Sequence, residues 1–261
     1  MPRYRLLLEY DGGHFFGWQR QPHVATVQGH LEQRLGVLCG HPVQVVGAGR
    51  TDTGVHALGQ VAHFDTSNPR AGDVFVRALN ATTPRSLTVL ACCQVPPEFH
   101  ARYSARYREY LYRLHLRPQP SALNRERLWH VGLPLDAVAM EKAASVLLGT
   151  HDFSAFRAAS CQSKSPVRVM YRLELIQREA ELHLVFGANG FLHHQVRNMV
   201  GSLVQVGSGR YSVQQFEKIF ISRDRTQAAA TAPPWGLYLT RVDYAGEVVW
   251  DDPLEKTGSF R

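Results

Sequence analysis

The order of the predicted secondary-structure elements constrains the fold of this 261-residue chain most strongly, because the same order occurs twice. In the first half, alternating or continuous apolar stretches predict strands at residues 4–10, 43–46, 60–65 and 87–95. Apolar residues at helical spacing predict helices over 27–38, between the N-cap Thr26 and the stop Gly40, and over 73–79. The order is therefore strand, helix, strand, strand, helix, strand.

The second half of the chain repeats this order. Its predicted strands are residues 107–116, 167–176, 181–186 and 236–244, and its predicted helices are 136–148, 191–206 and a shorter one near 214–221. Each half is similar to a split β-α-β unit of the ferredoxin-like type. We therefore predict an α+β fold of two similar halves that face each other, with the N-terminal half at residues 1–104 and the C-terminal half at 105–261.

Composition narrows the cellular setting and the class of partner. Lys and Arg outnumber Asp and Glu by 29 to 22, and the resulting net charge of +7 favours polyanionic partners such as nucleic acid. The four cysteines show no Cys-x-x-Cys spacing and are too few for a disulfide scaffold. The apolar run Leu6 to Leu8 is too short for a signal peptide or a membrane span. We expect a cytoplasmic protein without a membrane segment, and a mobile polar tail at residues 251–261.

A glycine-rich loop at residues 47–57 is the densest feature of the sequence. It follows a Val-rich strand, as a dinucleotide-binding loop does, but Asp52 stands where that fingerprint needs its third glycine. A carboxylate there would repel a pyrophosphate, and the alternation at residues 60–64 is typical of a strand rather than a helix. The loop therefore presents an aspartate. Arg50 lies two residues earlier, so on an extended segment its side chain can point the same way as Asp52.

Other chemically capable residues have ambiguous patterns when taken alone. Tyr110 and Tyr112 lie on one side of a predicted strand, which is equally typical of core packing. On the predicted helix over 191–206, His193 and Arg197 are four residues apart and would form a polar stripe beside an apolar surface. No His/Cys pairing has zinc-ligand spacing, and His193 and His194 are adjacent, so we predict no metal site.

The loop Gly49-Arg50-Thr51-Asp52-x-Gly54-Val55-His56-Ala57 resembles the signature of the TruA family of pseudouridine synthases. Further blocks are similar to that family in order along nearly the whole chain: Tyr10-Asp11-Gly12, Phe16-x-Trp18-Gln19-x-Gln21, Thr26-Val27-Gln28, Phe99-His100-Ala101-Arg102, Tyr110-x-Tyr112, His151-Asp152-Phe153, Ser165-Pro166-x-Arg168, Phe191-Leu192-x-x-x-Val196-Arg197-Asn198-x-Val200-Gly201, Ala232-Pro233 and Gly236-Leu237-Tyr238. The family usually has Ala at the position of Thr53 and often Arg at that of Leu111. Neither departure removes a group that the chemistry requires.

The resemblance implies a tRNA pseudouridine synthase with antiparallel sheets around a central RNA-binding cleft. It further implies a homodimer without a cofactor that isomerises uridines 38, 39 and 40 of the anticodon stem-loop. Asp52 would be the nucleophile, Arg197 its cationic partner, and Tyr110 the active-site tyrosine, whose ring stacks on the uracil and whose hydroxyl can help proton movement. Arg50 would fill the space that the extracted base leaves, and Arg168 would contact RNA, as would the weaker candidates Arg20, Arg102 and Lys164.

The chemistry of the reaction agrees with this assignment of Asp52. Pseudouridine formation breaks the N-glycosidic bond and rejoins the uracil through carbon, with no net redox change, and an ionised carboxylate can attack or stabilise the sugar as in retaining glycosidases. Attack on the ribose, attack on the base and elimination all stay open. A noncatalytic RNA-binding module is an alternative, but it leaves Asp52 without a purpose. A nucleoside hydrolase is another, and it would release free uracil.

Overall fold

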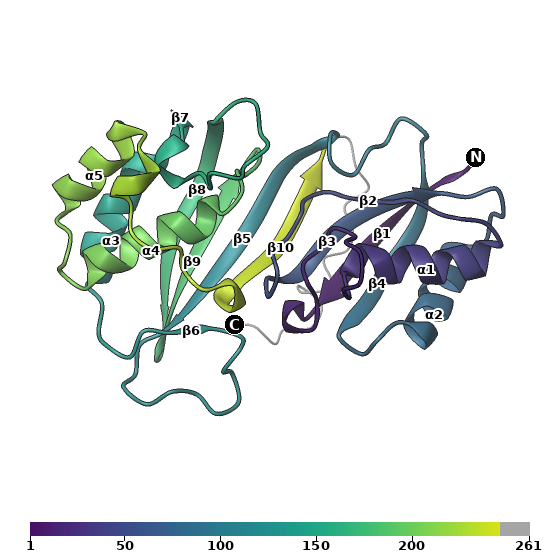
Figure 1. Ribbon diagram of the computed structural model, residues 1–261, viewed down its shortest axis with the longest axis horizontal. Coiled ribbons are helices and arrows are strands. Elements are labelled where there is room, and N and C mark those ends of the chain that lie inside the picture. Colours follow the sequence, from purple (N-terminus) through teal and green to yellow (C-terminus); the bar gives the residue numbers. More distant parts are fainter. Residues whose placement is uncertain (246–261) are drawn as a thin grey trace.

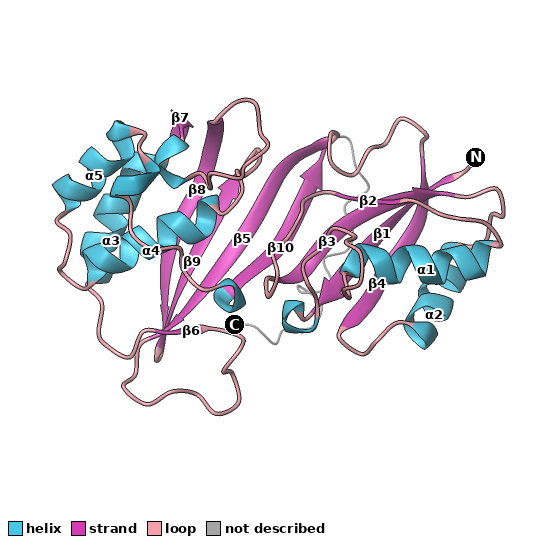
Figure 2. Cartoon of the chain, in the orientation of Figure 1, coloured by secondary structure: helices cyan, strands magenta, loops and turns pink. Residues whose placement is uncertain are grey.

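A computed structural model describes residues 1–245, so the tail predicted at 251–261 lies outside the described residues. The fold is mixed α+β and is built on one large, mostly antiparallel sheet (Figure 2). The strands of the first half are β1 (Arg3–Tyr10), β2 (Val45–Gly47), β3 (His56–Asp65) and β4 (Leu87–Val95). Those of the second half are β5 (Ala105–His115), β6 (Trp129–His130), β7 (Gly149–Asp152), β8 (Val167–Arg178), β9 (Glu181–Ala188) and β10 (Leu237–Tyr244).

The strand order shows how the two halves are joined. Along the sheet the order is β4-β1-β3-β10-β5-β9-β8-β7. In addition, β2 pairs with β3, and β6 pairs with β5. The strand β10 pairs with β5 in antiparallel fashion and with β3 in parallel, where Tyr238 and Leu239 lie opposite His56 and Ala57. Strands from both halves therefore form one continuous sheet, with β10 and β5 in the middle (Figure 1).

Residues 1–245 form five α-helices: α1 (Val27–Cys39), α2 (Gly72–Thr82), α3 (Ala137–Ala144), α4 (Gln195–Gly207) and α5 (Val213–Ser222), of which α5 packs on α3 and α4. In Figure 1, α1 and α2 accompany the N-terminal strands, and the other three accompany the C-terminal strands. The predicted ends of α1 are confirmed, since the Thr26 hydroxyl accepts the N–H of Gly29 and Gly40 adopts a left-handed conformation at φ +74°. Within residues 1–245, no helix is both long and apolar enough to cross a bilayer.

Each half has its own hydrophobic core. The N-terminal core includes Leu6, Leu31, Phe64 and Phe75, and the C-terminal core includes Tyr112, Phe153, Phe186, Met199 and Phe216. Each core also contains a side chain from the other half of the chain. Val55, from the glycine-rich loop, packs in the C-terminal core, whereas Leu239 of β10 packs in the N-terminal core. The loop that carries Asp52 is thus anchored against the opposite half of the molecule.

Three sequence predictions need correction. The helix predicted from residue 191 begins at Gln195, because His194 is left-handed at φ +62° and forms its N-cap, so His193 does not share a helical stripe with Arg197. The helix predicted over 136–148 ends at Ala144 and continues as a 3-10 turn over Ser145–Leu147 before β7 begins. The strand β3 begins at His56 rather than at residue 60, and the short strands β6 and β7 were not predicted at all.

Candidate active site

Asp52 lies in the loop between β2 and β3, and the backbone fixes the shape of this loop. The Thr51 carbonyl accepts the N–H of Trp18 at 3.0 Å, and the Asp52 carbonyl accepts the N–H of Val55 at 3.1 Å. Gly54 is left-handed at φ +80°, and Gly17 passes so closely that a Cβ there would lie 2.8 Å from the Thr51 oxygen. These contacts hold the carboxylate at the tip of a tight turn.

The C-terminal half supplies a cation for this carboxylate. Arg197, near the start of α4, donates from Nη1 to Asp52 Oδ2 at 2.8 Å, and its Nε donates to the Ala232 carbonyl at 2.8 Å. The side chains of Asp52 and Arg197 are 22% and 12% exposed, so the pair is partly shielded from water. The structure thus brings together two residues that are 145 positions apart in the sequence.

Two histidines also contact Asp52, and sequence reasoning gave them no role at the carboxylate. His193 Nε2 lies 3.3 Å from Oδ1, and His194 Nε2 lies 3.3 Å from Oδ2. The only sequence signal was their position three and four residues before Arg197, which we interpreted as part of a helix. Burial lowers the pKa of His194, in opposition to the raising effect of the Asp52 charge.

Tyr110 lies on β5 beside the same cavity. Its ring packs edge-on against Phe191, with 5.2 Å between the ring centroids. Burial, followed by the neighbouring Tyr10 and Asp52, raises the pKa of Tyr110 well above its usual value of 10. The hydroxyl is therefore protonated at neutral pH and available as a donor. Tyr112, on the same side of β5, is instead fully buried and donates to the Pro233 carbonyl at 2.7 Å.

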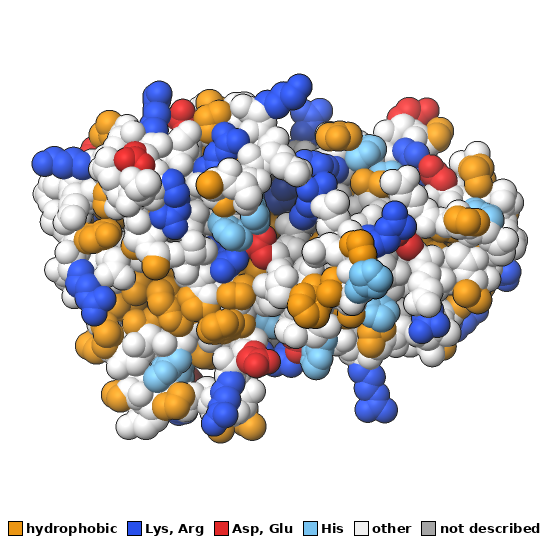
Figure 3. All heavy atoms as spheres, viewed as in Figure 1, with side chains coloured by type: hydrophobic (Ala, Val, Ile, Leu, Met, Phe, Trp, Pro, Cys, Tyr) orange, Lys and Arg blue, Asp and Glu red, His pale blue; other side chains and the backbone are white. Residues whose placement is uncertain are grey.

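A cavity of about 1140 Å³ surrounds these groups and takes its walls from both halves. Arg50 reaches across it to donate to Gln162 Oε1 at 3.3 Å, and Arg168 on the other wall donates to Ser163 Oγ at 2.8 Å. Figure 3 shows basic side chains around the middle of this face, where histidine and acidic atoms lie together. Of the weaker candidates, Arg102 lines the cavity, whereas Arg20 and Lys164 do not.

Arg108 is a further lining residue that sequence reasoning missed. Its guanidinium donates to four carbonyl groups on three segments: those of Ala48, Arg102, Ala105 and Asn189. Burial lowers the pKa of Arg108, which still leaves it charged at neutral pH. The residue ties the beginning of the Asp52 loop to the C-terminal wall. Nothing in its sequence position distinguishes it from a solvated arginine on a strand.

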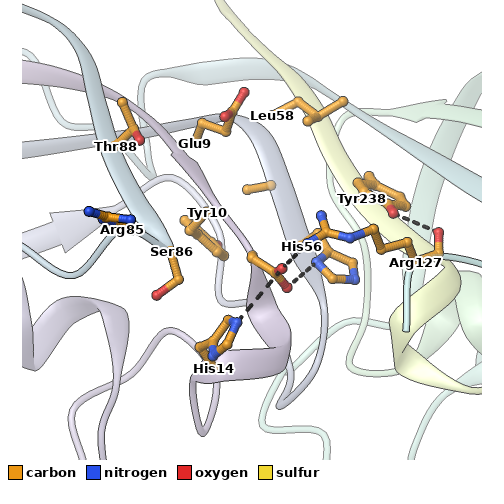
Figure 4. A pocket seen from close by; sticks show the side chains of 12 residues that line it. Glu9, Tyr10, His14, His56, Leu58, Arg85, Ser86, Thr88, Arg127 and Tyr238 are labelled. Atoms are coloured by element: carbon orange, nitrogen blue, oxygen red, sulfur yellow. Dashed lines mark hydrogen bonds and ion pairs between the residues drawn. The ribbon is translucent and has the colours of Figure 1, made fainter. Parts of the chain in front are cut away.

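A second cavity, of about 340 Å³, lies behind the end of the Asp52 loop (Figure 4). His56 lines it, and its Nε2 lies 3.0 Å and 3.1 Å from the carbonyl oxygens of Glu126 and Trp235. Asp11 accepts from Arg127 at 2.6 Å and lies 3.1 Å from His56 Nδ1. Burial lowers the pKa of His56, so the neutral ring carries its proton on Nε2, facing the two carbonyls. This network of contacts therefore fixes the position of His56 at the end of the Asp52 loop.

Asp52, His193 and His194 also offer three ligand atoms within 4.8 Å of one another, a spacing that could hold a metal ion. Arg197 already occupies one oxygen of the carboxylate, and its positive charge opposes a second cation there. The absence of a resident metal therefore stays a prediction.

Comparison with known proteins assigns the chain to a family. The family model described as tRNA pseudouridine synthase matches residues 7–104 and 143–245, which include Asp52 and Arg197. The chain belongs to the tRNA pseudouridine synthase family. Proteins named tRNA pseudouridine synthase A are similar over nearly the whole chain. The relative from Rhodospirillum rubrum is 47% identical over 248 residues (95% of this chain and 89% of the relative).

Two further relatives with the same name support the assignment. The one from Paraburkholderia phytofirmans is 48% identical over 259 residues, covering 99% of this chain and 95% of the relative. The one from Paramagnetospirillum magneticum is 50% identical over 246 residues, covering 94% and 96%. As a member of the pseudouridine synthase family, the protein is an isomerase that acts on tRNA.

Proposed function

We propose that this pseudouridine synthase isomerises the uridines at positions 38, 39 and 40 of the tRNA anticodon stem-loop, with Asp52 as its nucleophile. The observation that carries the proposal is the Asp52–Arg197 pair, held at 2.8 Å within a cavity that both halves line. A carboxylate without a neighbouring cation would weaken RNA binding in a groove, because it would repel the phosphates. Paired with Arg197, its charge is balanced, and it can stabilise or attack the sugar as the glycosidic bond breaks.

The two bond changes require a proton to move. The N1–C1′ bond of uridine breaks, C1′ bonds to C5, the proton on C5 departs, and N1 of the turned uracil gains a proton. Tyr110 supports this step by its position, because it lines the same cavity as Asp52. We propose that the ring stacks on the extracted uracil and that the hydroxyl takes part in the proton transfer.

The remaining side chains of the cavity suit RNA rather than a free nucleoside. The cavity is far larger than a nucleobase, and Arg50, Arg102, Arg108 and Arg168 line it. We propose that Arg50 enters the space that the flipped base vacates and that Arg168 contacts the RNA backbone. Exposed aromatic rings at the same cavity, Phe16 and Tyr103, offer faces on which other bases can stack.

The finer architecture belongs to the same proposal. The partial strand orders β4-β1-β3-β2 and β10-β5-β9-β8 match each other, which supports two related ferredoxin-like halves at residues 1–104 and 105–261 around the cleft. The family resemblance also implies a homodimer in the cytoplasm, where two clefts can engage tRNA by its shape. Sedimentation of the free protein and of its tRNA complex measures the number of chains in each.

The test of this function is pseudouridine mapping on unmodified tRNA transcripts that carry a uridine at only one of positions 38, 39 and 40. We expect modification of all three transcripts and of none in which cytidine replaces that uridine. Binding without modification of any tRNA would favour the noncatalytic RNA-binding module. Release of free uracil would instead indicate a nucleoside hydrolase.

A further inference from the structure

Arg197 alone does not fix the orientation of the Asp52 carboxylate. Its Nη1 contacts only Oδ2, and its Nε is committed to the carbonyl of Ala232. A carboxylate held through one oxygen can still rotate, unlike one held by a two-pronged arginine contact. Since a displacement of about 1 Å at a reacting group can cost about 100-fold in rate, a nucleophile benefits from a second anchor.

The turn before α4 provides such anchors. His193 Nε2 lies 3.3 Å from Oδ1 of Asp52, and His194 Nε2 lies 3.3 Å from Oδ2, so each carboxylate oxygen has its own imidazole. The two rings lie beside each other, with centroids 4.0 Å apart. The left-handed backbone of His194, at φ +62°, is a conformation that residues with a Cβ adopt only uncommonly. The chain adopts it at the point where two neighbouring imidazoles meet the same carboxylate.

The surroundings of each ring set the position of its proton. Ser160 Oγ lies 3.1 Å from Nδ1 of His193, so a hydroxyl that donates to Nδ1 leaves the proton of the neutral ring on Nε2, toward Asp52. The backbone fixes His193 as well, because its carbonyl accepts the N–H of Ala158 at 3.0 Å. His194 is neutral at pH 7, since burial lowers its pKa, and its Nε2 faces an acceptor oxygen. Both rings are therefore suited to donate to the carboxylate.

We propose that His193 and His194 are positioning residues that each donate a hydrogen bond to one oxygen of Asp52 and hold the carboxylate in one orientation before the uridine enters. This inference rests on the proposed role of Asp52 as the nucleophile. The histidines act through Asp52 and bring no bond change of their own. Their loss therefore slows the chemical step and leaves tRNA binding intact.

The test compares two substitutions at each position. In His193→Leu and His194→Leu the donor is lost, whereas in His193→Gln and His194→Gln an N–H group stands near the place of Nε2. Single-turnover rates on a tRNA transcript and the Kd for the same tRNA are measured at pH 7.5. We expect each Leu variant to lose about 10- to 100-fold in rate with Kd within about twofold, and each Gln variant to recover to within about fivefold of wild type.

His23→Leu is the matched control, because His23 also has φ +62° but is exposed and does not line the cavity. Thermal unfolding of all variants shows whether the turn still folds. Equal rates for the Leu and Gln variants would overturn the inference, and so would a weaker Kd at an unchanged rate. An active Asp52→Ala variant would instead refute the proposed function, whereas an inactive one beside fully active Leu variants would refute this inference alone.

Discussion

The two walls of the cavity present their functional groups in different ways. On the N-terminal wall, a contiguous loop carries Asp52, and its shape comes from backbone contacts, such as the Trp18 N–H on the Thr51 carbonyl. On the C-terminal wall, Tyr110 comes from β5, whereas His193 and Arg197 come from the start of α4 and the turn before it, and these side chains converge on the carboxylate or on its cavity. The acidic group is thus supplied by one half and its cation by the other, so the site is complete only when β10 and β5 hold the halves together.

This difference predicts that the C-terminal wall is most sensitive at Arg197. We expect Arg197→Leu to lower the single-turnover rate by about 100- to 1000-fold, because Asp52 loses the guanidinium that pairs with it in a partly shielded site. Arg197→Lys keeps the charge and should recover part of the rate. Arg210→Leu, an exposed arginine outside the cavity, is the control. A loss below about tenfold in Arg197→Leu would mean that the two walls are not coupled through this pair.

The N-terminal half should be sensitive to acid through His63, which lies on β3 outside the cavity. Burial lowers the pKa of His63 to about 4, and its Nδ1 accepts the N–H of Ala101. Because the pKa of this histidine is lower in the folded protein than in the unfolded chain, the neutral ring stabilises the fold relative to the protonated one. Its contribution to the free energy of unfolding is complete above about pH 6.5 and is lost as the pH falls toward 4. From the pKa difference we expect His63 alone to contribute a loss of about 3 kcal/mol of unfolding free energy over that window. Denaturant unfolding of wild type and His63→Gln at several pH values measures this, and parallel pH profiles for the two would contradict it.

Tyr110 separates stacking from proton movement on the C-terminal wall. We expect Tyr110→Phe to keep the ring and tRNA affinity but to lose about 100-fold in single-turnover rate, because the protonated hydroxyl is gone. Tyr110→Leu should be slower still, since it removes the ring face as well. If the Phe variant retained more than a third of the wild-type rate, the hydroxyl would have no part in the chemistry and the residue would act by stacking alone.

The basic groups on both walls should give the smallest effects, and on binding rather than rate. We expect Arg50→Ala and Arg168→Ala each to raise the Kd for tRNA several-fold and to reduce the salt dependence of binding by about one phosphate contact. Arg77→Ala on α2 is the control, because Arg77 pairs with Asp73 on an exposed face outside the cavity. An unchanged salt dependence in Arg50→Ala would place that residue away from the RNA backbone.

The same contrast explains what could be predicted from the sequence. On the N-terminal wall, Asp52 lies in one continuous motif, and its glycines and Asp52 are recognisable without a partner. The capped helix α1 follows equally local rules. The C-terminal wall depends on long-range strand pairing, such as that of β10 with β3. This parallel contact is short, and the local sequence gives no signal of it. The left-handed His194 cannot be inferred from helical spacing either, so the position of its ring beside Asp52 was missed.

The most direct test of the account is the rate of pseudouridine formation by Asp52→Asn, which removes the charge and keeps the size of the side chain. The neighbouring Thr53→Ala, which changes an exposed residue of the same loop, is the control. The account predicts that Asp52→Asn binds tRNA with Kd within a few-fold of wild type and loses at least about 10⁴-fold in single-turnover rate, while Thr53→Ala stays active. An Asp52→Asn variant that forms pseudouridine at a tenth of the wild-type rate or faster would contradict the assignment of Asp52 as the nucleophile.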